Sequence, residues 1–214
     1  MRSVRKYLAG LIMALSIFAC TPGTNESGQT QGDGLDSLTV STELKGRHAG
    51  KVVKVCDGDT YEIILEGEQQ PRRVRMYAID APESGQDFSR KSRHYLDSLI
   101  WKKQVTVDIL DIDSYDRLLV YTYLPDGREM SHEMVRAGYA WHYSHYDNDP
   151  VMDSLQLIAR NAGAGLWEDK CPVEPWIEKA MRKKGYKSLE IKKMKMDGEI
   201  DDLKMVRSIP KRFE

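Results

Sequence analysis

Several features that would assign a protein to a structural class at once are scarce in this 214-residue sequence. Three cysteines allow at most one disulfide bond, so disulfides cannot be its main framework. The apolar run from Tyr7 to Ala19 is too short for a membrane-spanning helix, which needs about 20 residues. No internal repeat is present, and the net charge of −1 shows no overall excess of either sign. What remains, with 41% hydrophobic and 30% charged residues, is typical of a soluble globular protein.

The small net charge conceals an uneven distribution of charged residues. From Gly46 to Glu178 there are 16 basic and 23 acidic side chains, whereas from Lys179 to Glu214 there are 12 basic and 6 acidic ones. An acidic body with a basic tail is not the profile of a protein that only coats nucleic acid. Most of the carboxylates are expected to be solvated, but the excess also suits a body that concentrates carboxylates for a cation.

The N-terminal residues have the pattern of an export signal. Basic side chains within residues 2–6 precede the short apolar run, which ends in the stretch I17-F18-A19-C20. This end resembles the lipobox of bacterial lipoproteins, in which the cysteine is lipidated. We therefore expect a signal peptide over residues 1–20 and a lipid anchor on Cys20 that attaches the protein to a membrane. Ordinary signal cleavage is the alternative.

Residues 21–45 are rich in Thr, Gly, Ser, Asn and Gln, which predicts a flexible linker. The expected product is an exported protein of the cell envelope, held on the periplasmic or cell-surface side of a membrane, or secreted if Cys20 carries no lipid. Cys56 and Cys171 then remain, an even number in an oxidising compartment. The sequence leaves open whether they form a disulfide bond or stay as buried free thiols.

Hydrophobic patterning predicts a mainly β domain with helices, of the α+β class. Alternating or β-branched runs predict five strands, at residues 51–56, 60–65, 73–78, 105–109 and 118–124. Helical spacing predicts about three helices, over residues 86–101, from an N-cap at Ser131 to Gly138, and over 150–162. Five short strands with interspersed helices favour a small barrel, closed or partly closed. Residues 172–214 form a lysine-rich extension, for which a rigid proline-containing connector and then a solvated helix or tail are expected.

Charged residues gather in three short stretches, D57-G-D59-T60, R75-M-Y-A-I-D80-A-P-E83 and D113-S-Y-D-R117. Each lies at a predicted strand end, where functional groups project from a rigid scaffold. Asp-Gly between two strands is also the strongest signal of a short hairpin. On the interpretation that joins both observations, Gly58 turns the chain so that Asp59 reaches Asp80.

The carboxylates of the first two stretches form a candidate cation site. Pro82 holds Ala81 extended, so that Asp80, the carbonyl of Ala81 and Glu83 are expected to point into one small volume. These are hard oxygen ligands of the kind that Ca²⁺ takes, and without Cys or His they do not form a zinc set. Asp59 completes the group. The pairs His132-Glu133 and His142/His145 lack the further ligand that a zinc site requires.

Arg75 and Arg117 supply positive charge beside this candidate cation site. Guanidinium groups offer planar, paired donors that match phosphate oxygens. A divalent cation, two arginines and a carboxylate that acts as a base are the parts required for displacement at phosphorus. A purely structural ion-pair network is the alternative, although isolated surface pairs stabilise a fold by only about 0–1 kcal/mol.

The three stretches, in this order and with G163-A-G-L-W167 after them, resemble the staphylococcal nuclease (thermonuclease) family from about Gly50 to Trp167. The resemblance implies a calcium-dependent phosphodiesterase domain on an oligonucleotide-binding (OB-fold) barrel, here at residues 46–171. It places the calcium ligands at Asp59, Asp80 and the Ala81 carbonyl. The same resemblance assigns catalytic roles to Arg75, Arg117 and Glu83, the last activating or orienting the attacking water. Asp57 and Thr60 would support the metal ligands.

Three positions depart from the family pattern. Ala81 stands where the best-known member has threonine, although a carbonyl ligand does not need a particular side chain. Asp116 stands where the loop D-x-Y-G-R has glycine, which is expected to alter the turn or lower phosphate affinity. Of the aromatic pair that stacks on the nucleotide, Tyr146 aligns without a gap, whereas Ser144 stands at the other position. Tyr143 or Tyr115 is expected to substitute for the missing ring.

The sequence therefore predicts a monomeric, calcium-dependent nuclease that hydrolyses phosphodiester bonds of DNA and RNA with little sequence preference and leaves 3′-phosphates. The alternative is a non-catalytic OB-fold module that binds nucleic acid or protein. The charged site residues are usually replaced in such modules, so their presence here favours the enzyme. A structural envelope lipoprotein with a vestigial site is a third interpretation.

Overall fold

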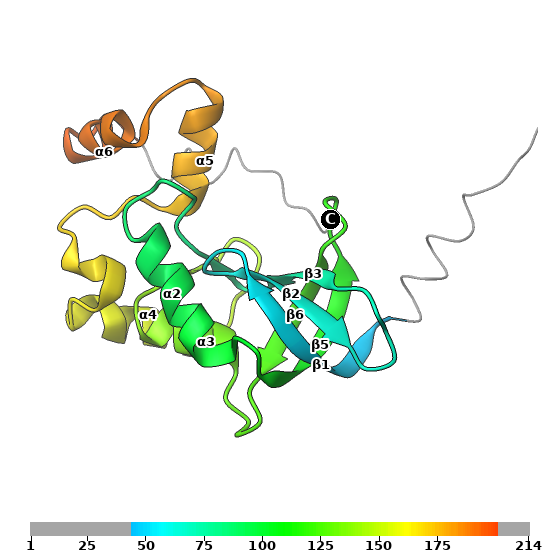
Figure 1. The fold of residues 1–214 in the computed structure, drawn as a ribbon. Coiled ribbons are helices and arrows are strands. Elements are labelled where there is room, and N and C mark those ends of the chain that lie inside the picture. Colours follow the sequence, from blue (N-terminus) through cyan, green and yellow to red (C-terminus); the bar gives the residue numbers. More distant parts are fainter. Residues whose placement is uncertain (1–43, 201–214) are drawn as a thin grey trace, which may run out of the picture.

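The barrel is built from five strands. The structure is a computed structural model that describes residues 44–200. Five strands close a barrel in the order β1-β2-β3-β6-β5 (Figure 1). They are β1 (Gly46–Val55), β2 (Thr60–Leu65), β3 (Arg72–Met76), β5 (Gln104–Ile112) and β6 (Leu118–Tyr123). Neighbouring strands run antiparallel except β3 and β6, which are parallel. The expected α+β fold with a five-stranded barrel is confirmed.

Alternation along the strands explains the barrel core. In β6 the buried residues Leu118, Val120 and Thr122 alternate with partly exposed ones, because successive side chains point to opposite faces of a sheet. The hydroxyl groups of Thr122 and Tyr61 lie 2.8 Å apart inside the barrel, so the buried polar atoms satisfy each other.

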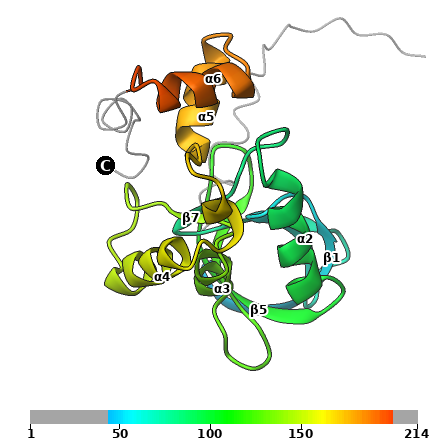
Figure 2. The same cartoon turned by 90° about the vertical axis from the view of Figure 1, so that its left-hand side faces the viewer.

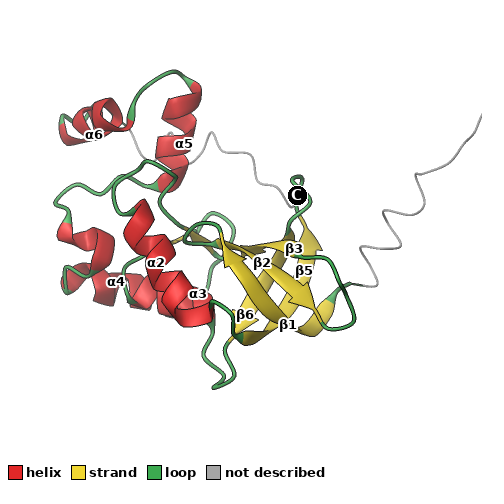
Figure 3. Ribbon diagram, in the orientation of Figure 1, coloured by secondary structure: helices red, strands yellow, loops and turns green. Residues whose placement is uncertain are grey.

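Three helices cover one end of the barrel, as Figures 1 and 2 show from two directions, and Figure 3 separates them from the strands by colour. They are α2 (Ser89–Ile100), α3 (Met130–Arg136) and α4 (Pro150–Asn161). The three predicted helices are thus confirmed. The predicted cap of α3 is wrong, because the carboxylate of Glu129 accepts the N–H groups of Ser131 and His132. The Ser131 hydroxyl instead donates to the carbonyl of Tyr77, 2.9 Å away.

The β1–β2 connection differs from the short Asp-Gly turn that the sequence suggested. β1 ends at Val55 and β2 starts at Thr60, so residues 56–59 form a longer loop. Gly58 does not adopt a positive φ angle. Glycine is required there by space, because a Cβ atom would lie 1.8 Å from Ser92 Oγ and 2.7 Å from Ala81 Cβ. The loop is therefore pressed against α2 and against the segment after Asp80.

A second, two-stranded sheet extends from the barrel. It pairs β4 (Ile79–Asp80) with β7 (Trp141–His142), and Asp80 stands opposite Trp141. A 3₁₀ helix, η1 (Gly165–Glu168), follows α4. His142 is buried and its ring nitrogens contact carboxylates of Asp153 and Asp147 at 2.7 and 3.1 Å. This histidine is accordingly a hydrogen-bonded structural residue, as the missing third ligand suggested.

The C-terminal extension is more ordered than the sequence indicated. Residues 172–200 contain α5 (Pro175–Lys183) and α6 (Ser188–Met196), which lie above the helical end of the barrel (Figure 2). A small core of its own joins the two helices, made of Val173, Ile177, Met181 and Ile191. The expectation of a solvated helix or tail is therefore wrong for α5, whereas α6 is a helix in which only Ile191 is buried. Ile177 and Met181, four residues apart, were the signal of a packed face.

Two expectations concern cysteines and the membrane. Cys56 and Cys171 are both free thiols, so the disulfide alternative is not realised. Between residues 44 and 200, each helix is too short or too polar to cross a membrane. The predicted signal peptide, Cys20 and most of the predicted linker lie outside the described residues.

Candidate active site

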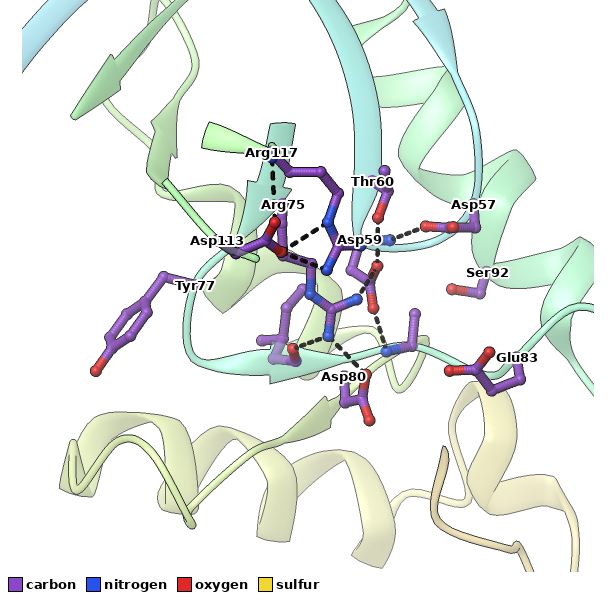
Figure 4. A network of polar contacts seen from close by, with 12 residues as sticks. Asp57, Asp59, Thr60, Arg75, Tyr77, Asp80, Glu83, Ser92, Asp113 and Arg117 are labelled. Carbon is purple, nitrogen blue, oxygen red and sulfur yellow. Dashed lines mark hydrogen bonds and ion pairs between the residues drawn. The ribbon is translucent and has the colours of Figure 1, made fainter. Parts of the chain in front are cut away.

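Arg75 lies at the centre of the buried charge cluster (Figure 4). Its guanidinium forms ion pairs with Asp59 and Asp80, the latter at 2.6 Å between Nη2 and Oδ1. Nη2 also donates to the carbonyl oxygen of Ile79 at 3.0 Å. The two aspartate side chains are only 3% exposed and that of Arg75 is 17% exposed. The structure thus brings three predicted site residues together, from β3, β4 and the loop before β2.

The local folding of the chain fixes the Asp59 carboxylate in place. Its Oδ2 accepts the backbone N–H of Ala81 at 2.7 Å, and its Oδ1 accepts the Thr60 hydroxyl at 2.9 Å. The N–H of Asp59 itself donates to Oδ1 of Asp57 at 3.1 Å. Thr60 and Asp57 therefore both bond to Asp59, and their support of a metal ligand stays a prediction.

Burial and charge act in opposite directions on the three aspartates. Burial and the negative charge of Asp59 raise the pKa of Asp57 to about 7. Burial also raises the pKa of Asp80, although Arg75 opposes it. The pKa of Asp59 is lowered in spite of its burial, because Arg75 and the donors from Ala81 and Thr60 favour its charged form. The site therefore holds more potential negative charge than one guanidinium balances.

Glu83 stands beyond this cluster, on the loop between β4 and α2. Its carboxylate is 31% exposed and is bound at 2.7 Å by Nζ of Lys179 from α5. Desolvation would lower the pKa of Lys179, but the charge of Asp80 and the contact with Glu83 outweigh it and raise that pKa. The N–H of Glu83 donates to the side-chain oxygen of Gln86 at 2.8 Å. Sequence reasoning missed Lys179, which lies almost 100 positions from Glu83.

Arg117 is held in the loop between β5 and β6. Asp113 accepts its Nε at 2.8 Å and its Nη2 at 2.6 Å, while Asp113 also accepts the backbone N–H groups of Tyr115 and Arg117. Arg117 directly precedes Leu118, which pairs with Val74 of β3, so Arg117 lies beside the strand that carries Arg75. Figure 4 shows both guanidinium groups directed into the same region.

The departure at Asp116 does not disrupt the turn. Asp116 has a φ of 58°, the left-handed conformation that a glycine adopts easily. Aspartate is one of the few other residues that tolerate this region, since its short polar side chain bonds locally. Aspartate therefore holds here a backbone conformation that glycine adopts easily, at a modest energetic cost, and the expected effect on phosphate affinity stays a prediction.

The three candidate tyrosines divide into a pair and a single residue. Tyr143 and Tyr146 meet edge to face, with ring centroids 4.8 Å apart. Trp176 of α5 stacks on Tyr143 at 4.9 Å with an interplanar angle of 12°. Tyr115 lies on the Asp113–Arg117 loop, is 66% exposed, and its ring faces the guanidinium of Arg117 at 5.4 Å. The contact of the extension with Tyr143 was not foreseen from the sequence.

The donor chemistry of the cluster fits a hard divalent cation. Asp59 and Asp80 offer buried carboxylate oxygens, which are the ligands that a hard divalent cation takes. Within residues 44–200, no three or more His, Cys, Asp or Glu side chains are grouped as metal ligands. A metal here would therefore depend also on oxygens other than side chains, such as the carbonyl of Ala81 that the resemblance indicates.

The barrel and its buried cluster of aspartates around Arg75 together define a small α+β barrel protein with a charged site. A family profile described as "Staphylococcal nuclease homologue" matches residues 73–169. An "Uncharacterized endonuclease" of Escherichia coli O157:H7 is 46% identical over 128 residues, covering 60% of this chain and 82% of the relative. A "Micrococcal nuclease" of Shigella flexneri is 36% identical over 149 residues, covering 65% of this chain and 84% of the relative.

A second "Uncharacterized endonuclease", from Haemophilus influenzae, is 38% identical over 136 residues, covering 64% of this chain and 75% of the relative. Identities of this size over most of the relatives' lengths are decisive. The chain belongs to the staphylococcal nuclease family.

Proposed function

We propose that this protein is a calcium-dependent nuclease that acts as a monomer on DNA and RNA with little sequence preference and leaves 3′-phosphates. The chain is a nuclease, and hence a hydrolase of phosphodiester bonds, as its family and its relatives named endonuclease and nuclease indicate. The observation that carries the proposal is the placement of Arg75 between two buried aspartates.

The proposed reaction uses groups that the site already orients. Arg75 has N–H groups on Nε and Nη1 beyond those that bind Asp59, Asp80 and Ile79, so it can also bind a phosphate oxygen. Arg117 has the same capacity through Nη1. These donors stabilise the charge that develops on the pentacoordinate phosphorus.

Glu83 is proposed to accept a proton from the attacking water. A carboxylate that is 31% exposed is accessible to water, and its second oxygen stays available when Lys179 binds the first. The water oxygen then forms a bond to phosphorus, the P–O bond to the 5′ oxygen breaks, and the leaving alkoxide takes up a proton from solvent. The 3′-phosphate product follows from which bond breaks.

Asp59, Asp80 and the carbonyl of Ala81 are proposed to hold Ca²⁺, which would supply positive charge at the scissile phosphate. Plasmid DNA and a single-stranded RNA are incubated with the purified protein in Ca²⁺ and in excess chelator. We expect cleavage of both substrates in Ca²⁺ and none in chelator. Binding of the plasmid without cleavage would support the non-catalytic module instead.

The role of Glu83 is tested by Glu83→Gln, which keeps the shape of the side chain. Removal of a general base typically lowers the rate about 10²–10⁴-fold. Glu66→Gln, at an exposed position after β2, is the matched control and should keep full activity. Equal traces of activity in wild type and Glu83→Gln would indicate a contaminating nuclease and a vestigial site.

We also propose that the protein is exported and anchored through a lipid on Cys20, on the basis of the sequence pattern at residues 1–20. Expressed in a bacterium, the wild type should sediment with membranes, while Cys20→Ser should move to the soluble fraction. Cys171→Ser is the control and should stay with the membranes. A wild type found only in the soluble fraction would contradict the anchor.

A further inference from the structure

The C-terminal extension contacts the candidate active site at several points. The family profile ends at residue 169, so α5 and α6 lie beyond the matched region. Lys179 and Trp176 of α5 nevertheless contact Glu83 and Tyr143, two residues assigned to the site. The extension is thus a neighbour of the proposed chemistry and not a separate appendage.

Further contacts tie the loop that carries Glu83 to the extension. Gln86 accepts the N–H of Glu83 and donates its own Nε2 to the carbonyl of Val173 at 2.6 Å. Arg182 donates to the carbonyl of Ser84 at 2.8 Å. The extension therefore contacts this loop at Glu83, Ser84 and Gln86.

The position of α5 is itself well determined by packing. Ile177 is fully buried and Glu178 is 1% exposed, with Oε1 of Glu178 bonded to Arg182 and to the Ser188 hydroxyl. These contacts fix α5 to α6, while the stacking of Trp176 on Tyr143 and the bond from Arg182 to Ser84 fix α5 to the domain, so Lys179 meets the loop from a supported backbone. Fixed supports of this kind are what hold a catalytic group in its productive geometry.

We propose that Lys179 is a positioning residue that acts through Glu83, so that the C-terminal extension forms part of the active site; this rests on the proposed function. Nζ of Lys179 lies 2.7 Å from Oε1 of Glu83, which restricts the carboxylate and leaves Oε2 for the water. An unrestrained glutamate on an exposed loop samples several rotamers, of which only some face the phosphate.

The principal test is Lys179→Met in the full chain, with kcat and KM measured in Ca²⁺ on a fluorogenic oligonucleotide. We expect kcat to fall about 10-fold while KM changes less than about twofold, since orientation of the base and not substrate binding is lost. Lys179→Arg, which keeps a cationic donor, should recover most of kcat. Lys183→Met is the matched control, because Lys183 lies on the same helix, is exposed, and forms no ion pair within residues 44–200.

A double variant shows whether Lys179 acts through Glu83. In a Glu83→Gln background, adding Lys179→Met should have no further effect, because a positioning residue has nothing left to position. Thermal unfolding of every variant is measured in parallel. Equal melting temperatures would show that the fall in kcat does not come from loss of the fold.

Each contrary outcome has a defined meaning. An unchanged or increased kcat in Lys179→Met would overturn the proposal, and an increase would show that the extension inhibits the site. A rise of KM at constant kcat would assign Lys179 to substrate binding instead. If the wild type does not cleave nucleic acid at all, the proposed function falls and the positioning role falls with it, whereas an active wild type with an equally active Lys179→Met removes the positioning role alone.

Discussion

Gly58→Ala is the most direct test of how the site is assembled. A Cβ atom at this position would lie 1.8 Å from Ser92 Oγ, 2.7 Å from Ala81 Cβ and 3.0 Å from Ser92 Cβ. Rotation of the Ser92 side chain relieves only the first contact. The other two involve Cβ atoms that move only with the backbone, so the loop that carries Asp59 must shift.

The expected loss in the free energy of unfolding is the sum of two costs. Ser92 is fully buried and its hydroxyl donates to the carbonyl of Tyr139 at 2.6 Å, so rotating it away leaves a buried acceptor unpaired, at about 1–3 kcal/mol. Overpacking against Ala81 adds about 1–3 kcal/mol. We therefore expect Gly58→Ala to lower the free energy of unfolding by roughly 2–6 kcal/mol.

The assay is urea denaturation of Gly58→Ala, Ser92→Ala and the double variant, at pH 7 without divalent cations. Because Ser92→Ala removes the atom closest to the new Cβ, the two costs should not add, and a coupling of about 1–2 kcal/mol is expected. Additive costs, or a loss below about 1 kcal/mol for Gly58→Ala alone, would refute the close packing of this loop against α2.

The remaining predictions concern the charges of the site. Arg75→Met leaves Asp59 and Asp80 without their shared cation and should lower the free energy of unfolding by about 3–5 kcal/mol at pH 7, measured by urea denaturation; a cost below about 1 kcal/mol would show that water already screens the cluster. Asp57 has a pKa of about 7 in the folded protein, above its ordinary value of 3.8, so its ionisation destabilises the fold progressively as pH rises from about 4 to 7. Asp57→Asn should therefore be nearly neutral at pH 4 and stabilising by roughly 2–4 kcal/mol at pH 8, and the same gain at both pH values would contradict the shifted pKa. Asp116→Gly should keep the left-handed turn and raise the melting temperature slightly, with a gain of up to about 1 kcal/mol, and a loss of stability would show that the Asp116 side chain contributes more than its strained backbone costs.

The barrel could be predicted from the sequence because its signals are local. The run at residues 60–65 is rich in β-branched and aromatic residues and matches β2 in both its limits. The predicted strand at 51–56 ended near the right residue but started late, since β1 begins at Gly46. The ends of a strand depend on the strands that pair with it. For the start of β1 the partner is β5, which lies more than 50 positions away, so a short segment of sequence does not predict where β1 begins.

Some local signals were misleading because tertiary packing outweighed them. The Asp57-Gly58 pair predicted a tight turn, yet the glycine is needed for the close approach of α2. Ser131 resembled an N-cap, but its hydroxyl bonds to Tyr77 and Glu129 caps the helix. In both cases the sequence indicated a residue with a particular structural role. That role depends on a contact with a distant part of the chain, which the sequence pattern does not show.

The sequence by itself determined which residues carry charge, in what order, and on which strand ends they stand, because residue type and strand periodicity are properties of short segments. Only the tertiary structure decided that Arg75 bridges Asp59 and Asp80, and that Lys179 reaches Glu83. Such contacts depend on barrel closure and on the docking of α5, which bring together groups that are far apart along the chain. The ion pairs Arg75–Asp80 and Lys179–Glu83, with N–O distances below 3 Å, form only when the chain has folded in this way. No periodic pattern in the sequence predicts them.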